Sequence, residues 1–599
     1  MRKFVVALLI SVFSLCVFAG QFHTVPLSDS SYKIIRYAEL SGIIPLQSDV
    51  KPYTLNTVKN LLGQIMNSER ISESERTEIK VILGKLEKTY GTAEESGTEN
   101  FFKKGSIGFS GSVGNIKIGI KADSDNRAGI DSDKDKKISS RNLATAFIMG
   151  DIKNWLSYDM NFSLVIDKLD TATYNFNDFE FKSDGQYFIG GLNNVYALTG
   201  EEGIGVGLSY SPEITTSLLN DSLRILAGSY KRDWGPGINN LGLSGSANKF
   251  EAFEIQYQPT SWFRFSSLVG SLGVTMFREV YDVELPTQRE LFDSNISIHR
   301  AEFTVGNFKA DVYESVVWKK RFELSYINPL SIYWIAQNYQ GDWDTLLGGV
   351  DFSYRFPGFG RVYFGLSVDE FTSDIKHLFS NPRNMIAIQG GLEMALGFLD
   401  FGLLTIQGTY IPPFFGTHYI ETEPEYLRKA WGDAVYSVEY ANGGKGLSYP
   451  LNPDSLELLL GFSCAFGKGW SLDITVKDQI QSAQYTQVAG FSKDNYYGTL
   501  TNAGLSLNDA MDYVDEMKGK YSLKDFFSFV WKNTLDVDLT VKKAFLDFPV
   551  ELRAGANVIV DWTRNFTNED NNYGNKVSLQ DWNSPYFRLL MKLGFSVYY

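Results

Sequence analysis

The chain has 599 residues, 15% of them aromatic, and a formal net charge of −14 at pH 7. This acidic balance argues against nucleic acid as a partner. Beyond the first twenty residues the sequence has no run of about eighteen apolar residues, which excludes a helical membrane protein.

Residues 1–19 are predicted to be a secretory signal peptide. Two basic residues precede an apolar stretch that ends in "VFA", and this pattern predicts cleavage after Ala19. Cleavage removes Cys16 and leaves Cys464 alone, so we expect no intramolecular disulfide. An exported chain rich in Tyr, Phe and Gly without disulfides fits two classes: a large secreted β-protein or an outer-membrane β-barrel.

Residues 20–91 are predicted to form a small helical module of three amphipathic helices. The first begins near Asp29 and stops before a Gly and a Pro, the second has Thr54 as its N-cap, and the third ends at Gly91. The polar, acidic stretch "TAEESGTEN" (92–100) is predicted to be a linker to the rest of the chain.

From about residue 101 the hydrophobic period changes from 3.6 to 2. In "GIGVGLSY" (203–210), "RVYFGLSVD" (361–369) and "LDVDLTVK" (535–542), apolar residues alternate with small or polar ones. Strict alternation indicates strands with one apolar and one polar face. A soluble sandwich and a membrane barrel both produce this pattern.

The final stretch favours the barrel. Apolar residues occupy seven alternate positions from Phe587 to Tyr599, enough for a membrane-spanning strand, which needs about 9–11 tilted residues. Its aromatic end resembles the C-terminal signal of outer-membrane barrels, carried here by Phe595, Val597 and Tyr599. That resemblance implies outer-membrane lipid and the barrel-assembly machinery as partners. The alternative is an edge strand of a sandwich.

Because backbone groups in lipid must be paired internally, the sheet has to close on itself. The sequence therefore predicts an all-β transmembrane β-barrel over residues 101–599. One strand per ~25–30 residues, loops included, gives roughly 16–20 strands. Within this range we expect about 16–18 antiparallel strands. The longer polar connections, as loops or plugs, are expected at 122–142, 171–185, 239–249, 281–295, 414–450 and 485–528.

We expect no enzyme, cofactor or metal site. None of the four histidines stands in an arrangement that would activate a serine, and neither a G-x-S-x-G motif nor a phosphate-binding loop is present. The stretch "DSDKDKKIS" resembles half a calcium loop, but Lys136 replaces the turn glycine and Asn142 the bidentate glutamate. We interpret it as a solvated loop.

The stretch "KRDWGPGINN" (231–240) is a sharp turn with the chemistry of a sugar site. Gly235, Pro236 and Gly237 are expected to end a strand in a tight turn. Aromatic faces pack on sugar C–H surfaces, while Arg, Asp and Asn bond hydroxyls. These properties make Arg232, Asp233, Trp234 and Asn239 candidate ligand-binding residues, although ordinary barrel turns contain the same residue types.

The layout resembles the capsule assembly Wzi family of outer-membrane proteins. The family turn R-x-W-G-P-G matches residues 232–237, and a second block matches "NPL" (328–330) and "GDWD" (341–344). The resemblance implies an 18-stranded barrel with a periplasmic helical bundle, acting as a surface lectin that helps attach capsular polysaccharide. It adds Asp342, Trp343 and Asp344 to the candidate glycan-binding residues.

Two functional hypotheses follow, with a third beside them. The first is an outer-membrane barrel that binds or anchors surface polysaccharide. The second is a porin-like channel for small solutes, with the Gly, Ser and charged face lining water. The third is a purely structural outer-membrane protein.

Overall fold

The computed structural model describes residues 22–91, 105–133, 136–153, 155–168, 186–187, 195–201, 204–219, 221–272, 294–319, 322–340, 344–371, 375–378, 380–381, 384–413, 415–416, 440–442, 445–482, 523–545, 548–568 and 577–598. The predicted signal peptide, the linker at 92–100, and residues Asp342, Trp343 and Tyr599 lie outside these ranges. So does most of the predicted loop at 485–528.

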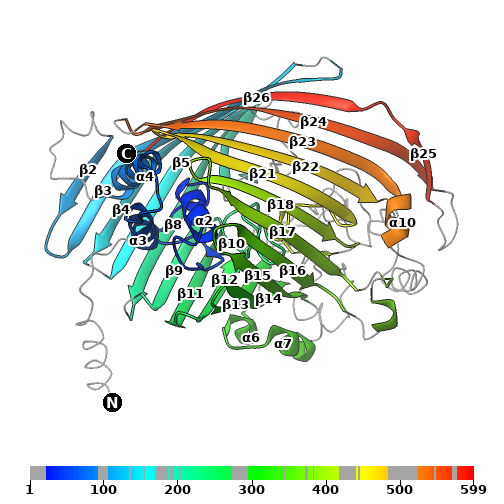
Figure 1. Cartoon of the computed structure of the whole chain (residues 1–599), viewed down its shortest axis with the longest axis horizontal. Coiled ribbons are helices and arrows are strands. Elements are labelled where there is room, and N and C mark those ends of the chain that lie inside the picture. The colour runs from blue at the N-terminus through cyan, green and yellow to red at the C-terminus, as the bar shows by residue number, and fades with distance from the viewer. Residues whose placement is uncertain are drawn as a thin grey trace.

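Eighteen strands of the described residues close into one antiparallel barrel (Figure 1). In ring order they are β3 (Gly114–Asp131), β4 (Lys136–Ile152), β5 (Leu156–Lys168), β8 (Ile204–Leu218), β9 (Leu223–Tyr230), β11 (Phe250–Thr260), β12 (Phe263–Ser271), β13 (Ser294–Val305), β14 (Phe308–Lys319), β15 (Thr345–Phe356), β16 (Gly360–Val368), β17 (Ile386–Leu396), β18 (Gly402–Ile411), β21 (Ser455–Gly467), β22 (Trp470–Ser482), β23 (Val530–Ala544), β24 (Val550–Asn568) and β26 (Tyr586–Val597). The predicted all-β barrel is confirmed, and the last strand, β26, pairs with the first, β3.

Shorter strands accompany the ring. They are β1 (Val50–Lys51), β2 (Ser106–Ser110), β6 (Gln186–Tyr187), β7 (Val195–Glu201), β10 (Asp233–Trp234), β19 (Ala441–Asn442), β20 (Lys445–Gly446) and β25 (Val577–Trp582). No helix among the described residues is long and apolar enough to cross a membrane.

The alternation in the sequence becomes an apolar outside and a polar inside. Exposed outward side chains include Phe162, Leu208, Phe364, Leu539 and Leu593. Their neighbours along the strands face the lumen, where Arg588 bonds Asp561 at 2.8 Å and Arg553 bonds Asp123 at 2.8 Å. This arrangement suits lipid outside and a hydrated or protein-filled interior.

One predicted loop is wrong. Residues 122–142 form the second half of β3 and the first part of β4, joined by a short turn after Asp131. Part of their outward face is polar: Ser124 donates to Asn142 at 2.7 Å and Ser140 donates to Asn126 at 2.7 Å, while Ile130 and Ile138 on the same face are apolar and exposed. We infer that the strand pairing continues beyond the apolar belt. Outward positions there do not have to be apolar, so the alternation is interrupted.

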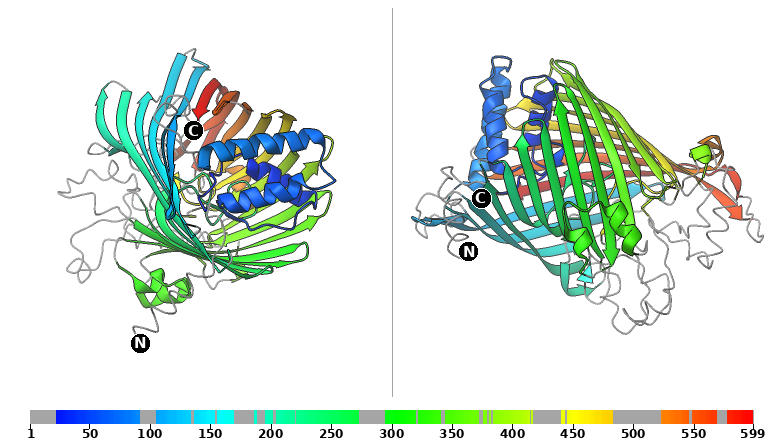
Figure 2. Two further views of the ribbon diagram at one scale, coloured as in Figure 1. Left: turned by 90° about the vertical axis from the view of Figure 1, so that its left-hand side faces the viewer. Right: turned by 90° about the horizontal axis from the view of Figure 1, so that it is seen from below.

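Three helices lie together at the end of the barrel that has the short turns: α2 (Ser31–Leu40), α3 (Leu55–Met66) and α4 (Glu73–Tyr90) (Figures 1 and 2). Thr54 caps α3, as predicted, and Ser72 forms a capping box with Glu75 at the start of α4. Their shared core includes Phe401 from a barrel turn, and Gly469 of another turn donates to Glu78 at 2.7 Å.

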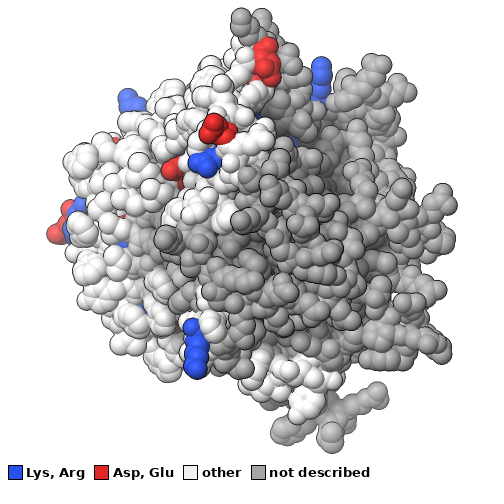
Figure 3. All heavy atoms as spheres, turned by 90° about the vertical axis from the view of Figure 1, so that its right-hand side faces the viewer, with Lys and Arg blue, Asp and Glu red and all other residues white. Residues whose placement is uncertain are grey.

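Three shorter helices and one 3-10 turn lie in connections at the opposite end: α6 (Leu324–Ile327), α7 (Tyr333–Gln340), α10 (Leu523–Ser528) and the 3-10 turn Ile375–His377. Figure 3 views that end, where the described surface carries a few separate charged side chains of both signs.

Candidate functional site

The R-x-W-G-P-G turn lies inside the barrel. Residues 231–249, here called the luminal segment, connect β9 to β11 and return through the lumen. Trp234 is 1% exposed, and its backbone pairs with Val50 of the N-terminal module through β1 and β10. Trp234 also donates its N–H to Leu243 O at 2.9 Å, which folds the segment back on itself.

Arg232 is bonded at the base of this segment. Its Nε donates to Glu254 Oε2 on β11 at 3.0 Å, and its Nη1 donates to the carbonyls of Tyr230 and Phe250. The guanidinium lies 3.9 Å from the ring centroid of Tyr230. Both members of the ion pair are fully buried, so Arg232 joins the two strands that the segment connects.

Asp233 and Asn240 shape the turn. Asp233 Oδ1 accepts from Asn240 Nδ2 at 2.7 Å and from the Gly245 N–H at 3.1 Å. Burial raises the pKa of Asp233, against the opposing effect of Lys51. Asn240 in turn accepts the Gly237 N–H at 3.0 Å, so one carboxylate and one amide close the loop.

Two wall glutamines hold the tip of the segment. Gln407 accepts from the Ile238 N–H and donates to the Ile238 carbonyl, both at 3.0 Å. Gln389 donates to the Asn239 carbonyl at 3.1 Å. A Cβ on Gly237 would lie 2.5 Å from Gln407 Oε1, so this close approach requires glycine.

A second stretch, residues 440–442 and 445–451, packs on the luminal segment. Tyr440 donates to Gly242 O at 2.7 Å, and Asn442 and Asn248 bond each other's carbonyls. Trp234, Leu243, Tyr440 and Tyr449 belong to one apolar cluster with inward side chains of β11 to β15, β17 and β18. The described chain therefore fills this side of the lumen with protein.

The opposite wall remains polar. Lys477, Lys532, Asp561 and Arg588 of β22 to β26 line a cavity of about 100 Å³ beside Leu451. Small-molecule sites enclose about 300–1,000 Å³. This cavity by itself is too small for a sugar site.

A cluster of buried charges joins the N-terminal module to the wall. Asp49 bonds Lys309 at 2.8 Å and lies 3.4 Å from Arg361 Nη1, and its N–H donates to Glu302 at 2.8 Å. Burial opposes the charged carboxylate, but Lys309, Arg361 and Arg36 hold the pKa of Asp49 well below its ordinary value. This cluster fixes the segment before β1 against strands β13, β14 and β16.

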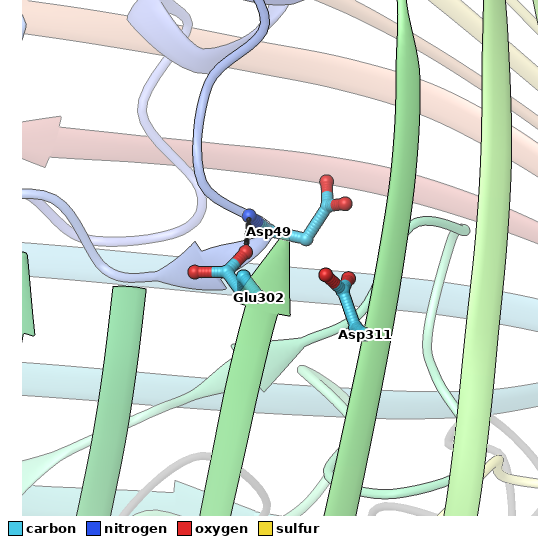
Figure 4. A group of neighbouring side chains, drawn as sticks. All are labelled: Asp49, Glu302 and Asp311. Carbon is cyan, nitrogen blue, oxygen red and sulfur yellow. Dashed lines mark hydrogen bonds between the residues drawn. The ribbon is translucent and has the colours of Figure 1, made fainter. Parts of the chain in front are cut away.

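The carboxylate oxygens of Asp49, Glu302 and Asp311 lie close enough to one another to bind a metal ion together, and the three side chains point toward one another (Figure 4). However, Lys309 bonds Asp49 and also Glu302, at 2.7 Å, and Arg300 bonds Asp311 at 2.6 Å. The chain's own cations therefore neutralise the carboxylates, and the group serves as a charge lock.

The second family-like block lies elsewhere. Asp344 is buried and accepts the hydroxyl of Tyr326 at 3.0 Å, and Asn328, Pro329 and Leu330 lie between α6 and α7. Asp344 bonds to this helical hairpin through Tyr326 and Gln337, while Arg232, Asp233, Trp234 and Asn239 belong to the luminal segment and bond within it or to the strands that hold it. The glycan role of all these residues stays a prediction, with Arg232 and Trp234 shielded from solvent.

Sequence reasoning did not find Gln389, Gln407 or the charge lock. Gln407 stands in "LLTIQGTY" as an ordinary polar position of an alternating strand. Nothing local distinguishes a wall glutamine that holds a segment from one that faces water. The long separation of the partners, 254 positions for Ser48 and Glu302, leaves no short motif.

The chain matches no protein-family profile, and no curated protein matches it in sequence. Its structure is similar to that of Wzi from Escherichia coli, described as an outer-membrane protein involved in group 1 capsule assembly and a carbohydrate-binding β-barrel. The TM-score is 0.51 at 9% identity, over 97% of this chain and 100% of that one. OccK1 (OpdK) and OprD of Pseudomonas aeruginosa give TM-scores of 0.37 and 0.35 at 10% and 9% identity. Both matches cover 80% of this chain, and they cover 98% of the OccK1 chain and 95% of the OprD chain. The likeness to Wzi shows the fold: this chain has the fold of an outer-membrane β-barrel.

Proposed function

We propose that this protein is an outer-membrane barrel of the Wzi type that binds surface polysaccharide. The observation that carries the proposal is the likeness to a carbohydrate-binding barrel over nearly the whole chain, with the R-x-W-G-P-G turn inside the lumen. The predicted signal peptide and the apolar outer belt support placement in the outer membrane.

The arrangement of the lumen supports a binder over a channel. The luminal segment, residues 440–442 and 445–451, and the N-terminal module occupy the interior along β11 to β18. We then assign glycan contact to the end with the long connections, and Asp342 and Trp343 belong in sequence to the connection between β14 and β15. Arg232 and Trp234 support this end indirectly, by fixing the luminal segment.

The porin-like alternative rests on one observation. The wall formed by β22 to β26 and β3 carries charged side chains such as Lys477, Arg553 and Lys592 toward the lumen. A water-filled passage along this wall would give a steady conductance.

Binding of the refolded full-length protein to a glycan array tests the proposal. We expect binding to at least one bacterial surface polysaccharide and its loss in Trp343→Ala. Trp262→Ala is the matched control, because Trp262 is exposed on a turn at the opposite end. Unchanged binding in Trp343→Ala would remove this residue from the site, and a wild-type protein that binds no glycan would overturn the function. Trp234→Ala is a poor probe, since truncating a buried Trp costs about 3–5 kcal/mol of stability.

A further inference from the structure

A helical hairpin lies on the outside of the barrel wall. Residues 322–340, here called the outer hairpin, contain α6 and α7 and lie outside the ring in Figure 1 and in the left view of Figure 2. Tyr326 and Tyr333 pack on Val316 and Trp318 of β14. The inward positions of β14 are the odd ones, such as Lys309 and Asp311, so Val316 and Trp318 face outward.

The inner face of the hairpin covers a polar patch on this wall. His299 and Glu314 are outward neighbours on β13 and β14, and 3.3 Å separates His299 Nε2 from Glu314 Oε2. Tyr333 stacks on His299 at 4.4 Å between ring centroids, and its N–H donates to Glu314 at 2.9 Å. Polar groups facing hydrocarbon without partners cost several kcal/mol each, and the hairpin provides partners.

The outer face of the hairpin is apolar and aromatic. Leu330 is 82% exposed, Trp334 62% and Tyr339 87%, and Phe322 and Leu324 are also exposed. The one charged residue in the hairpin, Glu323, accepts from the Ser325 backbone and hydroxyl at the start of α6. Apolar surface of this extent is rare against water and marks a contact with lipid or protein.

The position of the hairpin along the strands favours lipid. β14 has 12 residues, about the length that crosses a membrane, and the hairpin covers its last third. At the other end of the same strands, Trp262, Phe263 and Phe303 form an aromatic cluster. Membrane barrels carry aromatic girdles at both interfaces. Trp334 and Tyr339 place the second girdle of this wall on a helix.

We propose that the outer hairpin is an interfacial membrane segment: its inner face seals the His299–Glu314 patch and its outer face inserts at the boundary between headgroups and acyl chains. The inference rests on the proposed membrane location. Lipid is the committed partner, because the exposed face continues the outward apolar belt that includes Val312 and Phe308.

Site-specific fluorescence in lipid vesicles tests this placement. In a Cys464→Ala background, the variants Tyr339→Cys, Phe162→Cys and Glu69→Cys each carry an environment-sensitive dye on the new thiol. Phe162 is an exposed belt residue of β5, and Glu69 is exposed between α3 and α4. Phosphatidylcholine vesicles contain nitroxide lipids labelled near the headgroup or near the chain end, and iodide reports water.

We expect the Tyr339 dye to be quenched several-fold more by the shallow nitroxide than by the deep one, and to resist iodide. A Tyr339 dye that behaves like the Glu69 dye, while the Phe162 dye is lipid-quenched, would overturn the hairpin proposal alone. Shielding that disappears when the protein is diluted with excess lipid would also overturn it, in favour of a second copy. If the Phe162 dye is also exposed to iodide, the membrane location fails as well.

Discussion

Asp49 lies among three cations, and its contacts explain how the N-terminal module is held. Lys309, Arg361 and Arg36 lie within 2.8–3.5 Å of its oxygens, while Glu302 and Glu393 share two of these cations. A buried ion pair is weak evidence for net stability, but removing one partner leaves a buried charge without compensation. Asp49 is therefore a residue at which a small change has a large effect.

Asp49→Asn should lower the free energy of unfolding by about 3–5 kcal/mol at neutral pH. Because the pKa of Asp49 is depressed in the folded protein, its contribution is present above the unfolded pKa near 4 and is lost as pH falls below it. Urea unfolding in detergent at several pH values should therefore show the gap between wild type and variant closing below about pH 4. Asp133→Asn, at an exposed turn, is the control. A gap that is unchanged by acid would contradict the charge lock.

Arg232 shows how far single residues can be interpreted from the sequence. Arg, Asp, Trp and Asn suit a sugar because they offer donors, acceptors and an aromatic face. The same groups are needed where a segment crosses a lumen without water, and here Glu254, Asn240 and backbone carbonyls use them. Residue type alone cannot separate the two uses, because the partners lie far away in the chain.

At the scale of elements, alternation predicted the strands where one face meets an apolar surrounding and the other a polar one. Leu539 and Asp538 behave as expected. The rule fails where the lumen is filled with protein: Leu268, Ile296 and Leu347 face inward and are buried in the luminal core. It also fails in β3 and β4, whose outward faces become partly polar. The three helices of the N-terminal module were predicted well, since capping residues such as Thr54 are local signals, whereas α6 and α7 were not predicted.

Two glycines should respond in opposite ways to a methyl group. Gly63 lies inside α3 with nothing within 4 Å of a new Cβ, so Gly63→Ala should stabilise the protein by up to about 1 kcal/mol. Gly237→Ala should destabilise it by about 1–3 kcal/mol. The new methyl group would meet Gln407 Oε1, which accepts bonds from Tyr363 and Ile238, so moving this side chain away would break both bonds. Urea unfolding of both variants checks the pair. A fully stable Gly237→Ala protein would show that the segment does not pack on Gln407.

At the scale of the whole molecule, the barrel is built around its own chain. The N-terminal module closes on the short turns, β1 pairs with the luminal segment, and residues 440–442 and 445–451 pack above it. Barrel closure followed from the need to pair backbone groups in lipid. The filling could not be predicted from sequence, because contacts such as Lys33 with Asp473 join residues 440 positions apart.

Planar-bilayer conductance tests the central claim, that this barrel is filled by its own segments and acts as a binder, not a channel. We predict that the wild-type protein inserts without steady current. A variant in which residues 232–248 are replaced by a short Gly-Ser linker should conduct, because the bonds to Gln389, Gln407 and Glu254 are gone. A steady, solute-sized conductance from the wild-type protein would contradict the account and favour the channel.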